Sequence, residues 1–452
     1  MQIRSQRTSL SGHITVPGSK SHTIRALLLA ALAEGTSTIR NPLPSADCIS
    51  AGNAIPLLGA RIDFNGTEAP LWTVSGAGKG LHLPDDVIDV GNSGSLLYFL
   101  SPVAATLEGW SVFTGDESIR RRPVHHVVDV LRQLGAQAHV SRPGASTCPL
   151  LVRGAVCGSK KIITEGSISS QYISGLMLAG IRLGGTLEIE LTDPKETPYL
   201  TMTQDWMESV GVPVEVSADY RHIRVQGVEK ISAFDRTIPS DWEAVAFPLI
   251  AALITDSSIV IDNIDGGRTQ GDQAIVSVLQ SVGADIVWNK STATLAVRGS
   301  RLSAELLPQK TLRVNLSAYP DAVCALAAVA CFIEGTTVIE DIAVCRRKET
   351  DRIAVLSAEL TKLGAQVEQG EDYLVIHGHS PLTAEGGANP AFALHGATVE
   401  SHSDHRVAMA LACMGLGLPS GQTLTVRDAE CCAVSFPHFY DVMNGIGAGF
   451  SE

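Results

Sequence analysis

The stretch PDAVCALAAVACFIEGTTVIE (320–340) decides the fold, because it contains one complete structural unit. It opens on a polar pair, continues as an uncharged apolar segment, turns at a glycine and ends in an alternating strand. A helix that is apolar on every side belongs in the interior of a domain. The same order recurs six times, at residues 20–35, 92–109, 169–185, 240–256, 320–335 and 404–421.

A second pattern also recurs six times: an amphipathic run that closes on glycine and leads into a strand. Examples are QLGAQAHV (133–140) and KLGAQVEQ (362–369), and GIGAGF (445–450) is the sixth. Glycine suits the left-handed position that ends many helices. Successive closing glycines lie 72 to 83 residues apart, a period that indicates whole subdomains rather than a short-repeat solenoid. They are Gly59, Gly135, Gly211, Gly283, Gly364 and Gly447.

The pairing of helix types with strands predicts the architecture. HHVVDVLRQLGA (125–136) is amphipathic, and strands such as TLEIE (186–190) alternate, so one face of each sheet meets water. We therefore expect an α/β fold of two inside-out, barrel-like domains, each with three repeats whose sheets wrap around buried parallel helices. A chain of 452 residues is long enough for two domains. The N-terminal strand HITVPG (13–18) can pair with either half.

Composition narrows the class of partner. The 34 basic and 47 acidic residues give a net charge of −13, a poor match for nucleic acid or an anionic membrane. No apolar run has transmembrane length, and MQIRSQRTSL (1–10) lacks the apolar region of a signal peptide. The nine cysteines include no Cys-x-x-Cys, and Cys324, Cys331 and Cys413 lie in apolar helices, which indicates buried thiols in a reducing compartment, the cytoplasm.

Polar clusters stand at the starts of the predicted helices, where backbone N–H groups lack partners and the helix dipole is positive. Serine, asparagine and aspartate there are also ordinary N-caps, and Lys348 and Arg352 can equally form a solvated face bridged by Glu349 and Asp351. Capping does not explain the lysines and arginines, which the dipole disfavours, so we predict a site for a small polyanion. The clusters comprise Lys20, Ser21 and Arg25; Asn92 to Ser95; Arg120 to Arg122; Ser169 to Gln171; Lys348 to Arg352; and Asp404 to Arg406.

The same clusters carry a resemblance to a known family. PGSKSHTIRALLLAALAEGTS (17–37) resembles the opening motif of the enolpyruvyl transferases, in particular the branch that acts on shikimate 3-phosphate. The other motifs follow in the family's order along the chain: GNSGS (91–95), GD…RRP (115–123), SSQ (169–171), PY (198–199), YPDA (319–322), KETDRI (348–353), DHRVAMA (404–410) and SFPHF (435–439). The resemblance implies an N-terminal domain over 20–239, a C-terminal domain over 1–19 plus 240–452, and an active site in the cleft between them.

The reaction that the resemblance implies moves the carboxyvinyl group of phosphoenolpyruvate to the 5-hydroxyl of shikimate 3-phosphate and releases phosphate, a step of aromatic amino-acid (chorismate) biosynthesis. Addition and elimination through a tetrahedral intermediate need an acid and a base. We expect no cofactor, no metal and a monomer. By resemblance the catalytic residues are Asp321, Glu349, Lys20 and His405; phosphoenolpyruvate is bound by Lys20, Gly94, Arg122, Arg352 and Arg406; and shikimate 3-phosphate is bound by Ser21, Arg25, Ser169, Ser170, Gln171, Tyr199, Asp321 and Lys348.

Four positions depart from the family's pattern. Val434 replaces a lysine in RDAECCAVSFPHF (427–439), Tyr98 an arginine, Glu196 a serine that faces the shikimate phosphate, and Val344 an asparagine. A charge-assisted contact contributes about 1.5–3 kcal/mol, so these changes weaken the expected grip on substrate. Two alternatives therefore stay open beside the expected reaction: a paralogous transferase with another acceptor alcohol, and a ligand-binding homologue without catalysis.

Overall fold

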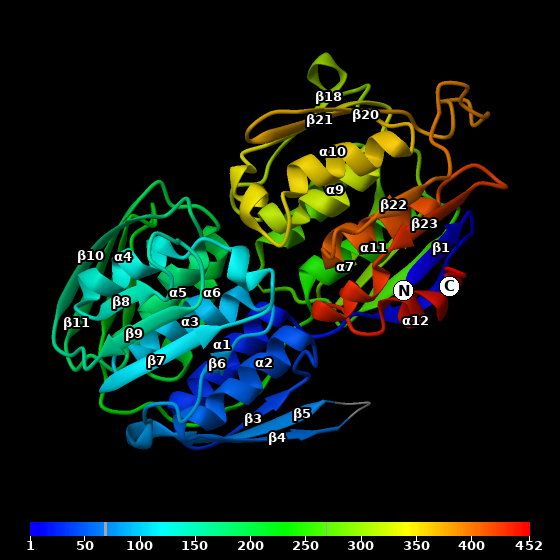
Figure 1. The fold of residues 1–452 in the computed structure, drawn as a ribbon. Helices are drawn as coiled ribbons and strands as arrows, with labels where there is room; N and C mark the ends of the chain where they lie inside the picture. Colours follow the sequence, from blue (N-terminus) through cyan, green and yellow to red (C-terminus); the bar gives the residue numbers. More distant parts are fainter. Residues whose placement is uncertain (67–69, 268) are drawn as a thin grey trace. The chain divides into compact units, whose positions relative to one another are not determined.

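The computed structural model describes residues 1–66, 70–267 and 269–452, which form two compact units. One unit is Gly18–Pro239, and the other is Met1–Pro17 together with Ser240–Glu452. In each unit helices lie inside and sheets lie outside, as Figure 1 shows. This arrangement confirms the predicted fold class.

The unit Gly18–Pro239 has three sheets in its described residues, each of four strands. Each sheet belongs to one repeat. Across the sheets, the strand orders are β14 (Asp235–Thr237), β3 (Glu34–Arg40), β5 (Leu71–Ala77), β4 (Arg61–Asn65); β6 (Ile88–Asp89), β7 (Gly109–Thr114), β9 (Leu150–Gly154), β8 (Gln137–Val140); and β10 (Lys160–Glu165), β11 (Thr186–Thr192), β13 (His222–Gln226), β12 (Val214–Val216).

The other unit also has three sheets in its described residues, but one of them has three strands instead of four. Across the sheets, the strand orders are β16 (Asp285–Asn289), β17 (Thr294–Arg298), β15 (Ser258–Asp262), β2 (Ser11–Thr15); β18 (Thr311–Asn315), β19 (Gly335–Glu340), β21 (Tyr373–Gly378), β20 (Gln366–Gln369); and β1 (Gln2–Gln6), β23 (Thr423–Arg427), β22 (Thr398–Glu400).

The first helix of each repeat is buried along nearly its whole length, which confirms the interior position predicted from its composition. The second helices are amphipathic or short. The first helices are α1 (Lys20–Leu32), α3 (Gly94–Ala104), α5 (Ser170–Gly180), α7 (Trp242–Leu253), α9 (Val323–Ala330) and α11 (His405–Gly415), and the second are α2 (Ala46–Ala54), α4 (His125–Leu134), α6 (Thr197–Ser209), α8 (Ile275–Gln280), α10 (Arg352–Lys362) and α12 (Phe439–Asn444).

The six closing glycines have the predicted left-handed backbone, with φ between 88° and 109°. Only glycine reaches this region without strain, so each glycine turns the chain after its helical segment, and all of them except Gly447 lead into a strand. Gly135, for example, follows α4, and β8 starts two residues later. The glycine signal in the sequence is therefore confirmed.

The four-stranded sheets share one pattern: a parallel pair followed by an antiparallel hairpin, as in β10 with β11 and then β13 with β12. The parallel strand normally precedes its own helix. At the two points where the chain passes between units, the parallel strand and the helix after it belong to different units. The strand β2 precedes α1 but pairs with β15, and β14 precedes α7 but pairs with β3. The N-terminal strand thus joins the unit that contains Ser240–Glu452.

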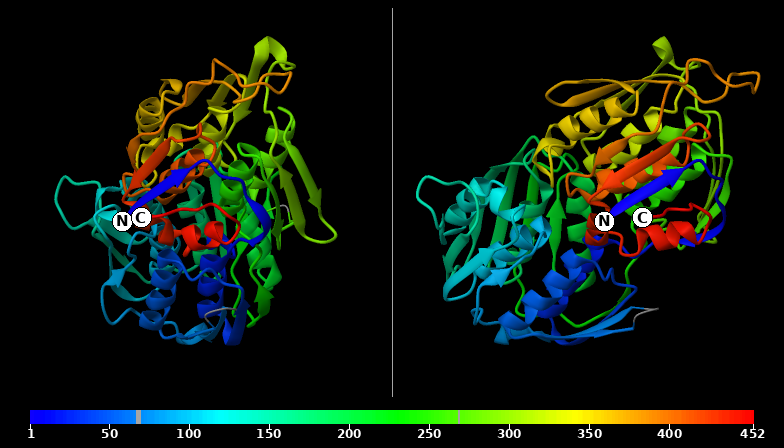
Figure 2. Two further views of the ribbon diagram at one scale, coloured as in Figure 1. Left: turned by 90° about the vertical axis from the view of Figure 1, so that its right-hand side faces the viewer. Right: turned by 45° about the vertical axis from the view of Figure 1, so that its right-hand side comes forward.

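The sixth repeat corrects the prediction from GIGAGF (445–450), because residues 448–450 form no strand. The strand that pairs antiparallel with β23 is β1, from the beginning of the chain. The end of the chain only touches β1, through a bridge between Arg4 and Ser451. The two termini consequently lie side by side, as both views of Figure 2 show.

Inside the unit Gly18–Pro239, α3 and α5 pack with their backbones in contact. A Cβ atom built on Gly175 would lie 2.1 Å from the carbonyl oxygen of Tyr98. Such a distance cannot be relieved by a side-chain rotation, because the obstructing atom belongs to the backbone. Gly175 is therefore what permits these two helices to lie so close together.

We predict that Gly175→Ala lowers the free energy of unfolding by about 1–3 kcal/mol, since the two helices must separate to admit a methyl group. Gly80→Ala in the same unit is the matched control, because no atom lies within 4 Å of its added Cβ. Urea unfolding followed by circular dichroism measures both variants. Equal stability of the two variants would contradict the close approach of α3 and α5.

Candidate active site

The guanidinium of Arg352, at the start of α10, is fully buried and contacts three carboxylates. Its nitrogens lie 2.5 Å from Asp321, 2.6 Å from Glu349 and 2.8 Å from Asp404. These carboxylates precede α9, α10 and α11, so one cation joins three helix starts. The interpretation of Lys348 and Arg352 as a solvated face is wrong, because Arg352 has no exposed side-chain surface.

Asp321 is surrounded by cations. Besides Arg352, the ammonium of Lys348 lies 3.4 Å and the Nε of Arg406 3.5 Å from its carboxylate. Burial alone would raise the pKa of Asp321, but the charges of Lys348 and Arg352 outweigh it and hold the pKa at about 2. The Asp321 carboxylate is therefore ionised at neutral pH.

The start of α11 places Arg406 and His405 beside this cluster. Asp404 caps the helix, and its carboxylate accepts a hydrogen bond from the backbone N–H of Arg406 at 2.9 Å. The guanidinium of Arg406 forms an ion pair with Glu243, in the first turn of α7. His405 is buried next to Arg406. Of the predicted residues, this unit brings together Asp321, Lys348, Glu349, Arg352 and Arg406.

Three carboxylates near this cluster were assigned no catalytic or substrate-binding role from the sequence: Glu243, Asp404 and Asp272. Burial raises the pKa of Asp272 well above its usual value, and the charges of Asp321 and Asp241 act in the same direction. Asp272 follows a glycine in a short 3₁₀ turn, Gly271–Ala274. Asp404 belongs to the cluster DHR in the sequence, but no local pattern marks Glu243 or Asp272 as a partner of the site.

In the unit Gly18–Pro239, Arg122 lies against the start of α3. A Cβ atom on Gly94 would come within 2.7 Å of the Arg122 guanidinium and 3.7 Å of the Gln171 side-chain oxygen. Gln171 in turn donates to Ser95 at 3.0 Å. The absence of a side chain at Gly94 thus lets Arg122 approach the positive end of this helix. Three predicted residues, Gly94, Arg122 and Gln171, meet here.

Lys20 is the first residue of α1, and its ammonium lies 3.3 Å from the carboxylate of Asp47, at the start of α2. Both side chains are largely buried. The ion pair stabilises a cation at a helix start where the dipole disfavours it. Asp47 is a further residue that sequence reasoning missed.

Arg25 is fully buried and donates to neutral oxygens only, among the described residues. Its acceptors are the hydroxyls of Thr203 and Ser174 and the carbonyls of Ser21 and Tyr199, at 2.8 to 3.3 Å. Burial lowers the pKa of Arg25 to about 9. Arg25 therefore connects the start of α1 to the start of α6 through its hydrogen bonds to the carbonyls of Ser21 and Tyr199.

Ser169 caps α5 by accepting from the backbone N–H of Gln171 at 3.2 Å. The next residue, Ser170, donates both its N–H and its hydroxyl to the carboxylate of Glu196. Glu196 is one of the four positions that differ from the family's pattern, and the other three are less polar. The Tyr98 hydroxyl donates to the Pro123 carbonyl at 3.5 Å, Val344 packs against the core, and Val434 is half-buried.

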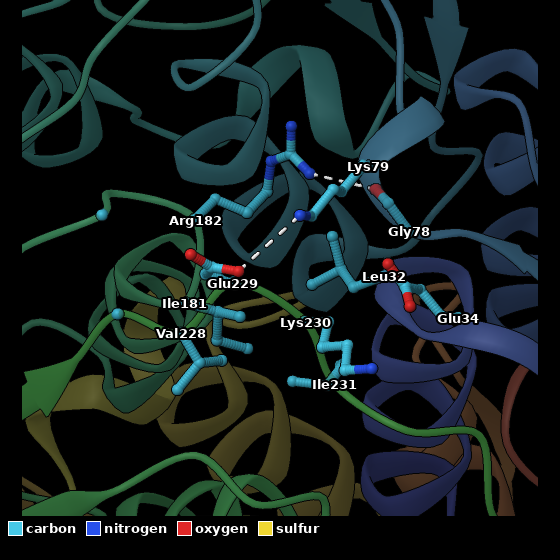
Figure 3. A pocket seen from close by; sticks show the side chains of 12 residues that line it. Leu32, Glu34, Gly78, Lys79, Ile181, Arg182, Val228, Glu229, Lys230 and Ile231 are labelled. Atoms are coloured by element: carbon cyan, nitrogen blue, oxygen red, sulfur yellow. Dashed lines mark hydrogen bonds and ion pairs between the residues drawn. The ribbon is translucent and has the colours of Figure 1, made fainter.

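A cavity of about 430 Å³ in the unit Gly18–Pro239 contains none of these residues. It lies beyond the last turns of α1 and α5, and Figure 3 shows its lining side chains. Arg182 donates to Thr106 and to the carbonyl of Gly78, and Lys79 pairs with Glu229 at 3.8 Å. Two cations of this cavity, Arg182 and Lys79, are thus directed at different protein groups rather than at one common point.

Two features are absent from the residues that the structure describes. No group of three or more histidines, cysteines, aspartates and glutamates there is placed to hold a metal ion. No described helix is long and apolar enough to cross a membrane. The nine cysteines form no disulfide, and seven of them are buried.

A fold of this kind with cationic clusters at its helix starts is what the resemblance to the enolpyruvyl transferases implies. Residues 5–443 match the family model described as EPSP synthase (3-phosphoshikimate 1-carboxyvinyltransferase). The chain belongs to the EPSP synthase family, which confirms the resemblance found in the sequence. The match covers nearly the whole chain, so it applies to both units.

Individual relatives agree. The chain is 34% identical over 447 residues to the 3-phosphoshikimate 1-carboxyvinyltransferase of Ruminiclostridium cellulolyticum, covering 99% of both chains. It is 37% identical over 439 residues to the protein of the same name from Methanothermobacter thermautotrophicus, covering 97% of this chain and 96% of that one. The structure of EPSP synthase from Acinetobacter baumannii matches with a TM-score of 0.80 at 27% identity, over 100% of this chain and 99% of that chain.

His22, beside the predicted Lys20 and Ser21, provides a pH test of this region. It is buried, and its Nδ1 accepts a hydrogen bond from Trp206 at 2.9 Å. Burial, helped by Arg25 and Arg236, lowers its pKa from 6.5 to about 3. Between these pH values His22 is protonated in the unfolded chain but neutral in the folded chain. The free energy of unfolding therefore decreases as the pH falls from about 6.5 toward 3.

We predict that the wild type loses about 2 kcal/mol more stability than His22→Gln between pH 7 and pH 5. Glutamine keeps an acceptor for Trp206 but does not titrate, so other titrating groups cancel in the comparison. Urea unfolding at both pH values measures the difference. Parallel losses in the two proteins would show that His22 is not held neutral.

Proposed function

We propose that this protein transfers the enolpyruvyl group of phosphoenolpyruvate to the 5-hydroxyl of shikimate 3-phosphate, with release of phosphate, in aromatic amino-acid biosynthesis. The family match over residues 5–443 supports the reaction. The observation that carries the mechanism is the Asp321 carboxylate held between Lys348 and Arg352, with Glu349 on the same guanidinium. These residues supply a base, an acid and cations within one small cluster.

The proposed reaction has two balanced steps. In the addition, the 5-hydroxyl oxygen bonds to C2 of phosphoenolpyruvate, its proton passes to a base, and the methylene carbon accepts a proton from an acid. In the elimination, the resulting methyl group returns a proton, the double bond forms again, and the bond to the phosphate oxygen breaks. Each step needs one acid and one base of the protein.

Asp321 is our proposed base for the hydroxyl proton. With a pKa of about 2, it is a weak base while Lys348 and Arg352 hold it. Phosphate and carboxylate groups of the substrates compete for these cations, and each cation drawn away raises the pKa of Asp321 toward a value useful for proton transfer. We assign proton transfer at the methylene carbon to Glu349 and Lys20, with His405 beside them.

The cations and helix starts are our proposed anion-binding groups. Arginine binds phosphate and carboxylate through two parallel hydrogen bonds, which suits the positioning of a small polyanion. We assign phosphoenolpyruvate to Lys20, Gly94, Arg122, Arg352 and Arg406. We assign shikimate 3-phosphate to Ser21, Arg25, Ser169, Ser170, Gln171, Tyr199, Asp321 and Lys348.

We further propose that the units correspond to an N-terminal domain over 20–239 and a C-terminal domain over 1–19 plus 240–452. The buried reduced cysteines support a cytoplasmic location. A monomer suffices, because the proposed residues all belong to one chain. A paralogous transferase with another acceptor is the second candidate, and the Glu196 carboxylate on Ser170 favours it.

The test is phosphate release from purified protein, which requires both substrates together. We predict that Asp321→Asn and Glu349→Gln each lower kcat by about 10²–10⁴-fold, the usual contribution of an acid or base. Glu340→Gln is the matched control, because Glu340 is an exposed carboxylate paired with Arg313 at 3.3 Å. Near-normal kcat in either site variant would refute its role. No phosphate release by the wild type would refute the proposed reaction.

A further inference from the structure

Glu196 directs its carboxylate to the start of α5. Its Oε2 accepts the backbone N–H of Ser170 at 2.8 Å and the Ser170 hydroxyl at 2.9 Å. Both residues are almost fully buried, with 2% of Glu196 and 1% of Ser170 exposed. The contact therefore lies in the interior of the unit Gly18–Pro239 and not between surface side chains.

The backbone before α6 fixes this contact. Glu196 is the N-cap of α6 and has a left-handed backbone with φ of 51°, a conformation unfavourable for glutamate. The turn that leads to it packs on Gly166, where an added Cβ would lie 2.6 Å from Pro194. Three residues after Glu196, the carbonyl of Tyr199 is held by Arg25 at 3.1 Å. Both sides of Glu196 are anchored, so only its side chain is left to move.

The donors that Glu196 occupies are those an anion needs. The first N–H groups of a helix have no partner within the helix, and the dipole there favours negative charge. A carboxylate on Ser170 uses this favourable position for the protein itself. A second anion at the same donors faces both competition for hydrogen bonds and repulsion between like charges.

We infer that Glu196 is an internal competitor for the phosphate group of the acceptor and thereby sets the affinity for the phosphorylated substrate. The inference rests on the proposed function, because it takes Ser169 and Ser170 as the acceptor's phosphate-binding residues. Binding exchanges one anion for another: the Glu196 carboxylate leaves Ser170, and the phosphate takes its hydrogen bonds. The acceptor's hydroxyls and ring do not take part in this exchange.

The test compares two ligands that differ only in the phosphate. Isothermal titration calorimetry measures the Kd of shikimate 3-phosphate and of shikimate for the wild type, Glu196→Gln and Glu196→Ser. We expect both variants to bind shikimate 3-phosphate about tenfold or more tightly than the wild type, the effect of one charge-assisted contact, and to bind shikimate within about twofold of it. Glu208→Gln, which alters an exposed carboxylate at the other end of α6, is the matched control and leaves both Kd values unchanged.

Two results overturn the inference: unchanged or weaker binding of shikimate 3-phosphate in both variants, or equal tightening for both ligands, which marks a merely structural effect. A thermal melt shows whether each variant is folded, and the serine variant decides if the glutamine variant is not. Phosphate release by the wild type separates the two proposals. If the wild type releases no phosphate but the variants bind shikimate 3-phosphate selectively more tightly, the proposed reaction is refuted and the inference about Glu196 stands. If the wild type releases phosphate normally but the variants show no tighter binding, the inference about Glu196 is refuted and the proposed reaction stands.

Discussion

The buried guanidinium of Arg352 is the constraint on which the cluster of Asp321, Lys348, Glu349, Asp404 and Arg406 depends. A buried charge is tolerated only when it is paired and hydrogen-bonded, and Arg352 meets this condition through three carboxylates. Because Asp321, Glu349 and Asp404 come from different helix starts, satisfying one charge also fixes where these starts lie. The same contacts raise the pKa of Arg352 well above its usual value, against the lowering effect of burial. The contacts that satisfy the buried charge of Arg352 therefore also position Asp321 and Glu349, our proposed catalytic carboxylates.

The clusters also share one electrostatic feature: several cations proposed to bind substrate are already paired with a carboxylate of the protein. Lys20 has Asp47, Lys348 has Asp321, and Arg406 has Glu243. At the start of α5, the helix itself has Glu196. An acidic protein can in this way keep concentrated positive charge without repulsion. On the proposed function, substrate binding is an exchange of anions, whose free energy is the difference between two similar interactions.

The sequence was informative where structure is local. Apolar segments such as the one that forms α9 predicted burial, and the closing glycines predicted left-handed turns, because both properties depend on a few neighbouring residues. Long-range pairing was not visible: β1 completes the sixth sheet, and no pattern near Gly447 shows that its own strand is missing. The motifs marked Asp321 and Arg352 as site residues. They did not mark Glu243, whose role comes from its contact with Arg406, more than 160 residues later.

Lys348 and Arg352 keep the Asp321 carboxylate ionised. Carbon-13 NMR of protein labelled at aspartate carboxyl carbons measures this ionisation, with the Asp321 signal assigned by its loss in Asp321→Asn. With a pKa of about 2, this signal should keep the shift of an ionised carboxylate from neutral pH down to about pH 4. A titration midpoint at about 4 or above, as for an ordinary aspartate, would contradict the account.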